Sequence, residues 1–225
     1  MLIYGKQPVY YALERHRDRI KTLFLAKEVD KKEYSALMKM GFEVKRIPEN
    51  AAQSMVKGGN HQGYIAEMSN LVPYASPFLK RCGFVVVLSS ITDMGNMGSL
   101  VRSAYALGVE ALVICGIKEP NLESLIRTSS GAALDLPLVV VHNIHDVMHE
   151  LKQSGFSLYG ATLKGTNVRE VSFDAKRALI LGSEGEGLSG RVEKGLDYGV
   201  SIEMAHDFDS LNVGVAGAIL MERMR

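Results

Sequence analysis

The hydrophobic and polar positions of this chain fall into two successive series of alternating strands and helices. In the first series, short apolar or alternating runs predict strands at 20–26, 42–47 and 64–68. Helical spacing of apolar residues predicts helices at 7–15, 31–40 and 50–56, and Gly41 is a stop signal for the second of them. Strands alternating with helices over about 70 residues predict a small α/β domain.

The second series is longer, and its strands are more apolar. Residues 84–88 form a nearly uninterrupted β-branched run, which is typical of a strand covered on both faces. Further strands are predicted at 111–115, 138–141, 156–162, 178–181 and 199–204, and helices at 96–107, 122–127, 145–153 and 211–225. This alternation of strands and helices predicts an open, mostly parallel sheet with helices on both faces. No G-x-G-x-x-G follows the first strand, which disfavours the usual dinucleotide-binding fold.

A segment with two prolines separates the two series. Residues 72–77 contain Pro73 and Pro77, and such a composition is typical of a linker. We therefore divide the chain into a first domain of residues 1–71, a linker of residues 72–80 and a second domain of residues 81–225.

Charge is distributed unevenly between these parts. Residues 1–71 carry 12 Lys and Arg against 8 Asp and Glu, whereas residues 72–225 carry 14 against 17. The chain as a whole has a net charge of only +1, but the basic excess of its first part favours a polyanionic partner. Cys82 and Cys115 adjoin apolar runs, which predicts buried thiols and a reducing cytoplasm. No signal-peptide pattern is present, and no apolar run approaches the ~20 residues of a membrane span.

The most distinctive stretch follows the strand predicted at 178–181. There Gly182, Gly185 and Gly187 are spaced by Glu184 and Glu186. Glycines after a strand allow a tight turn or a close approach of backbone to a ligand. The two acids exclude a phosphate cradle because they would repel an anion, and they favour a ligand that is cationic or rich in hydroxyl donors. The pattern alone leaves two interpretations open, a ligand-binding loop or a tight, solvated strand-to-helix turn.

A second loop stands at the end of the strand predicted at 84–88, at the edge where open α/β sheets bind ligands. Asp93 and Asn96 can both cap the helix that follows. Arg102 lies inside that helix, where it is a surface charge, an ion-pair partner or a bidentate phosphate ligand.

A third loop precedes the last helix of the chain. Asp209 or Ser210 is expected to be the N-cap of that helix. Gly214, Gly217 and Ala218 give the helix a face of small residues, which permits close packing on another helix in the same chain or in a partner.

Three sequence motifs coincide with these loops. An N-x-G-x-x-x-R pattern is formed by Asn96, Gly98 and Arg102, an L-G-S-E-G-E-G pattern spans 181–187, and an S-L-N-V pattern spans 210–213. Together they resemble motifs 1, 2 and 3 of the SpoU (TrmH) family of RNA ribose 2′-O-methyltransferases, in the SPOUT superfamily. Two positions depart from the family pattern, since Glu203 stands where a proline is usual and Gly214 where a serine is frequent.

The resemblance extends over nearly the whole chain. The first domain resembles the L30e-like RNA-binding domain of the rRNA-methylating members through Gly5, Val9, Ala12, Leu13 and the His61-Gln62-Gly63 stretch. His61 is interpreted as an RNA contact or a turn residue. The Ser129-Ser130-Gly131-Ala132-Ala133 stretch followed by Leu136-Pro137 resembles another conserved segment of the family.

The resemblance implies a fold and a cofactor. The fold would be a SPOUT α/β-knot, whose mostly parallel sheet ends in a C-terminal trefoil knot, and the protein would be a homodimer. The methyl donor would be S-adenosyl-L-methionine (AdoMet), whose sulfonium suits the acidic loop, and no metal would be needed. The implied cofactor-binding residues are Gly182, Ile202 and Leu211, with Thr162, Met204 and Glu184 nearby.

The resemblance also implies catalytic roles. The motif 1 arginine, here Arg102, is proposed in the family to activate the 2′-hydroxyl together with the substrate phosphate. Because arginine stays protonated at any ordinary pH, we expect Arg102 to be an electrostatic clamp on the phosphate and the developing alkoxide, which leaves the general base open. The residues expected to orient the ribose and the arginine are Asn96, Glu184, Ser210 and Asn212.

The expected reaction is therefore methyl transfer to a ribose 2′-hydroxyl of RNA, with a guanosine of 23S rRNA as the first expectation. A tRNA ribose methyltransferase of the same family is one alternative, which the L30e-like domain disfavours. A non-catalytic RNA-binding or ribosome-assembly protein is another, which the intact motifs disfavour. The spacing of His142, His145 and His149 superficially resembles a metal-binding face, but it is interpreted as polar surface because no Cys or carboxylate set accompanies it.

Overall fold

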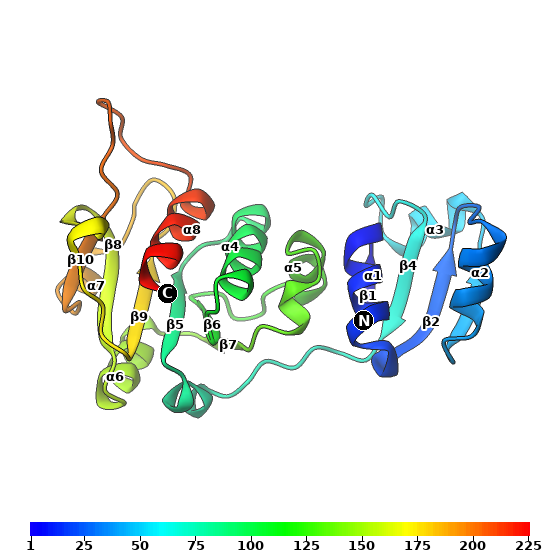
Figure 1. Cartoon of the computed structure of the whole chain (residues 1–225), viewed down its shortest axis with the longest axis horizontal. Helices are drawn as coiled ribbons and strands as arrows, with labels where there is room; N and C mark the ends of the chain where they lie inside the picture. Colours follow the sequence, from blue (N-terminus) through cyan, green and yellow to red (C-terminus); the bar gives the residue numbers. More distant parts are fainter. The chain divides into compact units, whose positions relative to one another are not determined.

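The computed structural model describes residues 1–225 and divides into two compact units (Figure 1). Unit 1 contains Met1–Val72 together with Asn121–Leu134, and unit 2 contains Pro73–Pro120 together with Asp135–Arg225. None of the helices has both the length and the apolar character that a membrane span requires.

Unit 1 is built on a mixed four-stranded sheet in the order β1-β4-β2-β3. The strands are β1 (Leu2–Tyr4), β2 (Ile20–Leu25), β3 (Glu43–Arg46) and β4 (Tyr64–Met68), and the helices are α1 (Lys6–Arg15), α2 (Lys31–Met38) and α3 (Glu49–Met55). The three predicted strands and three predicted helices are confirmed. The edge strand β1 was missed because three residues are too few to show a period.

One helix of unit 1 comes from the second strand–helix series. Helix α5 (Leu122–Thr128) lies beside β1, where the backbone N–H of Leu2 donates a 2.8 Å hydrogen bond to Oε1 of Glu123. The guanidinium of Arg127 lies 5.5 Å from the centre of the Tyr4 ring. Periodicity locates this helix well, but it does not show which sheet the helix packs against.

Unit 2 contains a six-stranded sheet in the order β10-β8-β9-β5-β6-β7, and every neighbouring pair is parallel. The strands are β5 (Phe84–Ser89), β6 (Ala111–Cys115), β7 (Leu138–Val141), β8 (Ser157–Asn167), β9 (Arg177–Leu181) and β10 (Tyr198–Ser201). The predicted open parallel sheet is confirmed. Its central strand β5 is buried along nearly its whole length, as its apolar run indicated.

Helices cover both faces of this sheet. On one face, α4 (Met94–Ala106) packs against α8 (Val213–Met224), and a Cβ on Gly217 would lie 2.3 Å from a methyl carbon of Leu100. The small-residue face predicted for the last helix is thus used within the chain. On the other face, residues of α6 (Ile144–Gln153), of α7 (Gly190–Glu193) and of the 3-10 helix Ser76–Arg81 share one apolar core with β5.

Two details of unit 2 differ from the predictions. Strand β8 continues to Asn167, and its pairing with β10 jumps from Gly160 to Thr166, so the intervening residues bulge out of the ladder. Helix α8 is capped by Asn212, so the expectation of Asp209 or Ser210 as N-cap was wrong. The Asn212 side chain can accept from backbone N–H groups of the first turn, and both Asp209 and Ser210 lie outside the helix.

Candidate active site

The acidic glycine loop is a tight turn at the carboxyl end of β9. The N–H of Gly187 donates to the carbonyl of Ser183 at 3.0 Å, and Gly185 and Gly187 have φ angles of 88° and 67°. A Cβ on Gly182 would lie 2.2 Å from the carbonyl carbon of Gly187, so backbone meets backbone there and only glycine fits. The turn leaves the Glu184 side chain exposed.

Asn212 joins this turn to the starts of two helices. Its Nδ2 donates 2.8 Å hydrogen bonds to Oδ1 of Asn96 and to Oε1 of Glu184. Its Oδ1 accepts the N–H groups of Gly214 at 3.0 Å and Val215 at 3.3 Å, which fixes the orientation of the amide. One side chain therefore holds all three predicted motifs together.

Helix α4 places Asn96 in this group. The Asp93 side chain is the N-cap of α4 and accepts the N–H of Asn96 at 2.7 Å. Arg102 lies six residues further along the same helix, about 9 Å along its axis. Its side chain is exposed, and no carboxylate of the chain pairs with it, so its charge is available to a ligand.

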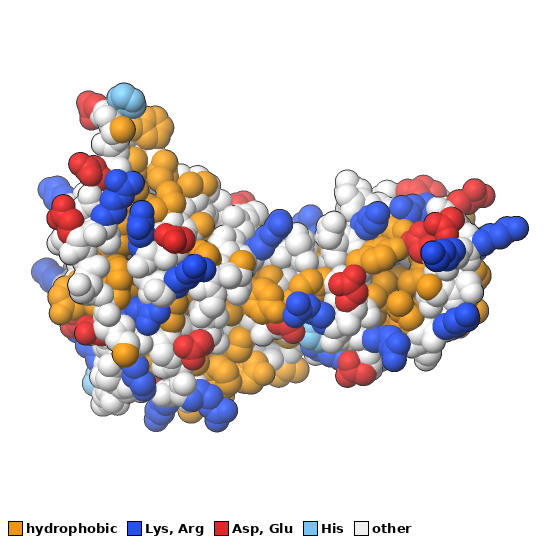
Figure 2. All heavy atoms as spheres, viewed as in Figure 1, with side chains coloured by type: hydrophobic (Ala, Val, Ile, Leu, Met, Phe, Trp, Pro, Cys, Tyr) orange, Lys and Arg blue, Asp and Glu red, His pale blue; other side chains and the backbone are white.

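The remaining predicted residues lie in the segment between β10 and α8 and in the bulge of β8. Ile202, Met204 and Leu211 are half-buried in the segment between β10 and α8, whereas Ser210 is exposed and outside the Asn212 hydrogen-bond group. Thr162 lies in the bulge of β8, where its Oγ1 would be 2.9 Å from a Cβ on Gly199. In Figures 1 and 2 the segment between β10 and α8 stands out from unit 2, with hydrophobic, acidic and histidine side chains at its tip.

Two hydrogen bonds anchor that segment at its beginning. Nδ2 of Asn167, at the end of β8, donates to Oε2 of Glu203 at 2.9 Å, and Oγ of Ser201 donates to the carbonyl of Gly165 at 2.8 Å. Glu203 is the residue found in place of the usual proline. Its side chain ties the start of this segment to the end of β8.

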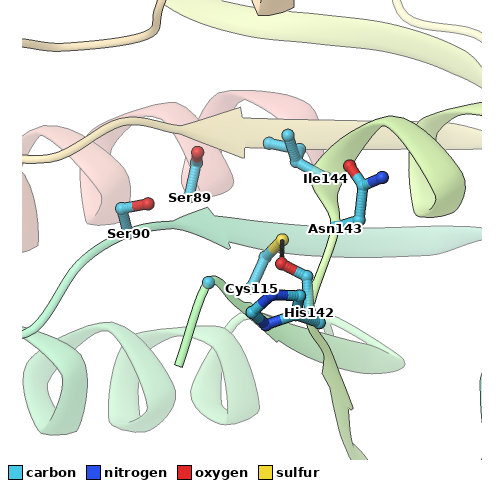
Figure 3. Close-up of a pocket in the computed structure, with 7 residues that line it drawn as sticks. Ser89, Ser90, Cys115, His142, Asn143 and Ile144 are labelled. Carbon is cyan, nitrogen blue, oxygen red and sulfur yellow. Dashed lines mark hydrogen bonds between the residues drawn. The ribbon is translucent and has the colours of Figure 1, made fainter. Parts of the chain in front are cut away.

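A cavity of about 370 Å³ opens at the carboxyl ends of β5, β6 and β7 (Figure 3). Ser90 adopts a left-handed φ of 57°, and a Cβ on Gly116 would lie 2.9 Å from its Oγ. Because the strands are parallel, the cavity shares the sheet edge with the turn after β9. Sequence reasoning had considered His142 only as part of a metal-binding face and Cys115 only as a buried thiol, although the two serines at the end of a buried strand were a usable signal. The cavity is lined by Ser89, Ser90, Cys115, Gly116, His142, Asn143 and Ile144.

Neither thiol nor metal chemistry is favoured by these surroundings. Burial raises the pKa of the Cys115 thiol to about 11, so the thiol stays protonated at neutral pH and is a poor nucleophile. Cys82 is likewise buried, as predicted, and burial raises its pKa to about 11. No group of three or more His, Cys, Asp and Glu side chains could hold a metal ion. Nε2 of His149 instead lies 2.9 Å from Nε2 of Gln153, and both residues are on α6.

Comparison with known proteins agrees with the fold. Residues 83–222 match the model of the SpoU rRNA Methylase family, and residues 2–73 match a family described as RNA 2′-O ribose methyltransferase substrate binding. A parallel sheet with three motif loops joined at one edge, together with these matches, defines an RNA ribose 2′-O-methyltransferase. The chain belongs to the SpoU family.

Individual relatives cover most or all of the chain. The 23S rRNA (guanosine-2′-O-)-methyltransferase RlmB of Yersinia pestis is 30% identical, over 100% of this chain and 96% of the relative. RlmB of Xylella fastidiosa is 33% identical, over 82% of this chain and 78% of the relative. Among solved structures, the SpoU methyltransferase AviRb of Streptomyces viridochromogenes in complex with AdoMet is 26% identical, with a TM-score of 0.76, and the match covers 100% of this chain and 88% of AviRb.

Proposed function

We propose that this protein transfers the methyl group of AdoMet to the ribose 2′-hydroxyl of a guanosine in 23S rRNA. The observation that carries the proposal is the hydrogen-bonding of Asn212 to both Asn96 and Glu184, which brings motifs 1, 2 and 3 to one edge of the parallel sheet. The RNA and the nucleotide are proposed from the names of the RlmB relatives, and the cofactor is supported by the AviRb complex.

The local chemistry of the loops suits AdoMet. Gly182 permits the close approach of backbone, and Ile202, Met204 and Leu211 offer half-buried apolar surface for the adenosine. Glu184 and the half-buried hydroxyl side chain of Thr162 offer acceptors for a cationic, hydroxyl-bearing ligand. We assign these six residues to the cofactor. When bound, AdoMet supplies an electrophilic methyl group on a sulfonium.

Methyl transfer is an in-line displacement, for which positioning of the reactants matters most. We assign Arg102 to the phosphate next to the target ribose and to the alkoxide that develops as the 2′-hydroxyl loses its proton. Arginine remains protonated, so the proton passes to another acceptor. Asn96, Glu184, Ser210 and Asn212 orient the ribose and the arginine in this proposal.

We further propose that the protein is a homodimer with a knotted C-terminal region and that it acts in the cytoplasm, where rRNA is made. Exposed apolar side chains support an interface near the end of the chain, namely Val215 (50% exposed) and Ile219 (37%) on α8, with Phe208 (69%) in the segment before it. Isolated apolar exposure is ordinary, but Val215 and Ile219 are one helical turn apart and share a face.

The decisive experiment is methyl transfer from labelled AdoMet to purified 23S rRNA and, separately, to bulk tRNA, followed by mapping of the modified ribose. Incorporation at one guanosine of 23S rRNA is the expected result. Methylation of tRNA alone would favour the tRNA-modifying alternative. Calorimetry with AdoMet tests the enzyme proposal itself, because a non-catalytic RNA-binding protein on this fold would bind no cofactor.

A further inference from the structure

The cavity at the carboxyl ends of β5, β6 and β7 has no part in the reaction proposed above. The register of the strands fixes its place relative to the acidic turn after β9. Leu181 of β9 pairs with Leu88 of β5, and the next residue of β5, Ser89, pairs with Cys115 of β6. Gly182 is therefore level with Ser89 and Cys115. Because neighbouring strands lie about 5 Å apart, the end of β6 is about 10 Å from the turn.

Motif 1 stands between the cavity and the proposed cofactor residues. In the sheet order, β8, β9 and β10 lie on one side of β5, whereas β6 and β7 lie on the other. The residues assigned to AdoMet belong to β8 and to the connections after β9 and β10. The cavity opens on the opposite side of β5, and the loop after β5 leads from Ser90 into motif 1. A ligand in the cavity is thus next to the proposed ribose site without occupying the cofactor site.

The walls of the cavity offer hydroxyl groups and apolar surface. Figure 3 shows Ser89 and Ser90 on one side of Cys115, with Asn143 and Ile144 on the other. Neither serine hydroxyl hydrogen-bonds within the chain, so both can donate to a ligand and accept from it. Ile144 is half-buried. The cavity can therefore hold a ligand that has both polar edges and an apolar surface.

Charge disfavours a phosphate group in this cavity. Its lining contains no Lys, Arg, Asp or Glu. The start of α6 would attract an anion, but Oδ1 of Asn143 already accepts the N–H of His145 at 2.9 Å, and Asp146 adds a negative charge to the first turn. Burial and, to a smaller extent, the Asp146 carboxylate raise the pKa of Cys115 to about 11. The preferred ligand is therefore uncharged.

We infer that this cavity takes up one unstacked base of the RNA substrate, beside the ribose that is methylated. The inference rests on the proposed function and adds a subsite for the substrate to it. A nucleobase is uncharged, has hydrogen-bonding edges and has apolar faces, and RNA-binding proteins commonly hold such bases between polar groups and aromatic rings. The exposed ring of His142 can stack on the base. A volume of about 370 Å³ lies within the range of small-ligand sites.

The first test measures access to the cavity and needs no methyl transfer. The variant His142→Cys is treated with a maleimide in the full chain, alone, with AdoMet, and with in-vitro-transcribed 23S rRNA. The two native thiols are buried and have raised pKa values, so they react slowly. Ser172→Cys is the matched control, because Ser172 is exposed and precedes β9, at the opposite edge of the sheet.

With rRNA at about ten times its Kd, labelling of the His142→Cys variant is expected to slow about tenfold, because the bound fraction is inaccessible. Labelling of Ser172→Cys is expected to be unchanged, and AdoMet alone is expected to affect neither variant. An unprotected His142→Cys variant would overturn the inference, and so would equal protection of the control. Protection by AdoMet alone would assign the cavity to the cofactor and overturn it as well.

The second test removes the two hydroxyls in the double variant Ser89→Ala/Ser90→Gly, with Ser172→Ala as its control. Glycine suits the φ of 57° at Ser90, so the loop can keep its path. Loss of two hydrogen bonds is expected to raise the KM for rRNA about tenfold. AdoMet affinity, measured by calorimetry, and the thermal midpoint are expected to match those of the wild type.

An unchanged KM for rRNA in the double variant would overturn the inference, as would an equal rise in the control. Failure of the proposed function is recognised separately. Wild-type protein would then leave rRNA unmethylated, whereas the labelling measurement still shows whether RNA enters the cavity.

Discussion

The two units present their polar groups in opposite ways. In unit 2, Asn212 locks neutral amides and a carboxylate to one another across three loops, while Arg102 is left without a partner. In unit 1, the charged Nζ atoms of Lys6 and Lys27 lie over tyrosine rings, and both lysines are exposed. Each arrangement suits a different task. A displacement at one atom needs fixed geometry, whereas the binding of a polyanion needs positive charge spread over a surface.

The largest effect is expected from Gly182→Ala, which tests whether the geometry of unit 2 is as tightly fixed as the contacts indicate. The new Cβ would meet backbone of Gly187, which cannot move without opening the turn. We expect the free energy of unfolding to fall by about 1–3 kcal/mol, measured by thermal unfolding. We also expect AdoMet binding to become undetectable by calorimetry. Gly190→Ala is the matched control, because nothing lies within 4 Å of its Cβ position. Wild-type cofactor affinity in Gly182→Ala would refute the assigned role of this turn.

The second largest effect is expected from Arg102→Ala, which tests the contribution of charge in unit 2 while the geometry of the loops is kept. The side chain is exposed and supports no other residue, so the fold should remain intact. We expect methyl transfer to fall by about 10²–10³-fold or more, as on removal of a group that stabilises developing charge. AdoMet affinity should stay within a few-fold of the wild type. An equal loss of cofactor binding would show that Arg102 serves AdoMet and not the RNA.

Asn212→Ala should have an intermediate effect on activity. It removes the N-cap of α8, at a cost of about 1 kcal/mol of stability. It also removes the hydrogen bonds through which Asn212 joins Asn96 to Glu184. We expect kcat/KM to fall about 10- to 100-fold through loss of positioning. Asn121→Ala removes the equivalent N-cap of α5 in unit 1 and should lower stability similarly without this loss of activity. If both variants lose activity equally, capping and not the contact between motifs is what matters.

The smallest effect concerns acid sensitivity in unit 1. Hydrogen bonds from Tyr10 and then Tyr64 lower the pKa of Glu33, so its stabilising contribution is present above the unfolded-state pKa of about 4.3. That contribution is lost as the pH falls through the lowered, folded-state value. Glu33→Gln should therefore lower the thermal midpoint slightly at pH 7 and leave the midpoint less dependent on pH below about 4. A Glu33→Gln protein with an unaltered acid profile would contradict this linkage.

Particular residues show how far the candidate site could be anticipated. Asn96, Glu184 and Asn212 were singled out from motifs, and the structure brings them into one hydrogen-bond group. The N-cap of α8 was misplaced at Asp209 or Ser210 because each residue type caps helices well, and only the path of the chain selects among them. The cavity beside β5 was missed because its lining residues come from three strands that are distant in sequence.

The sequence by itself determined the local elements and the chemistry they carry. Apolar period, glycine position and charge pattern depend on neighbouring residues, so they revealed the parallel sheet, the glycine-rich acidic stretch after the strand that ends at Leu181 and the basic excess of residues 1–71. Only the tertiary structure decided which distant residues meet. It attached α5 to the sheet of unit 1, and it made Asn212 the link between Asn96 and Glu184. Such contacts depend on chain closure and on packing between segments far apart in sequence, which no local pattern encodes.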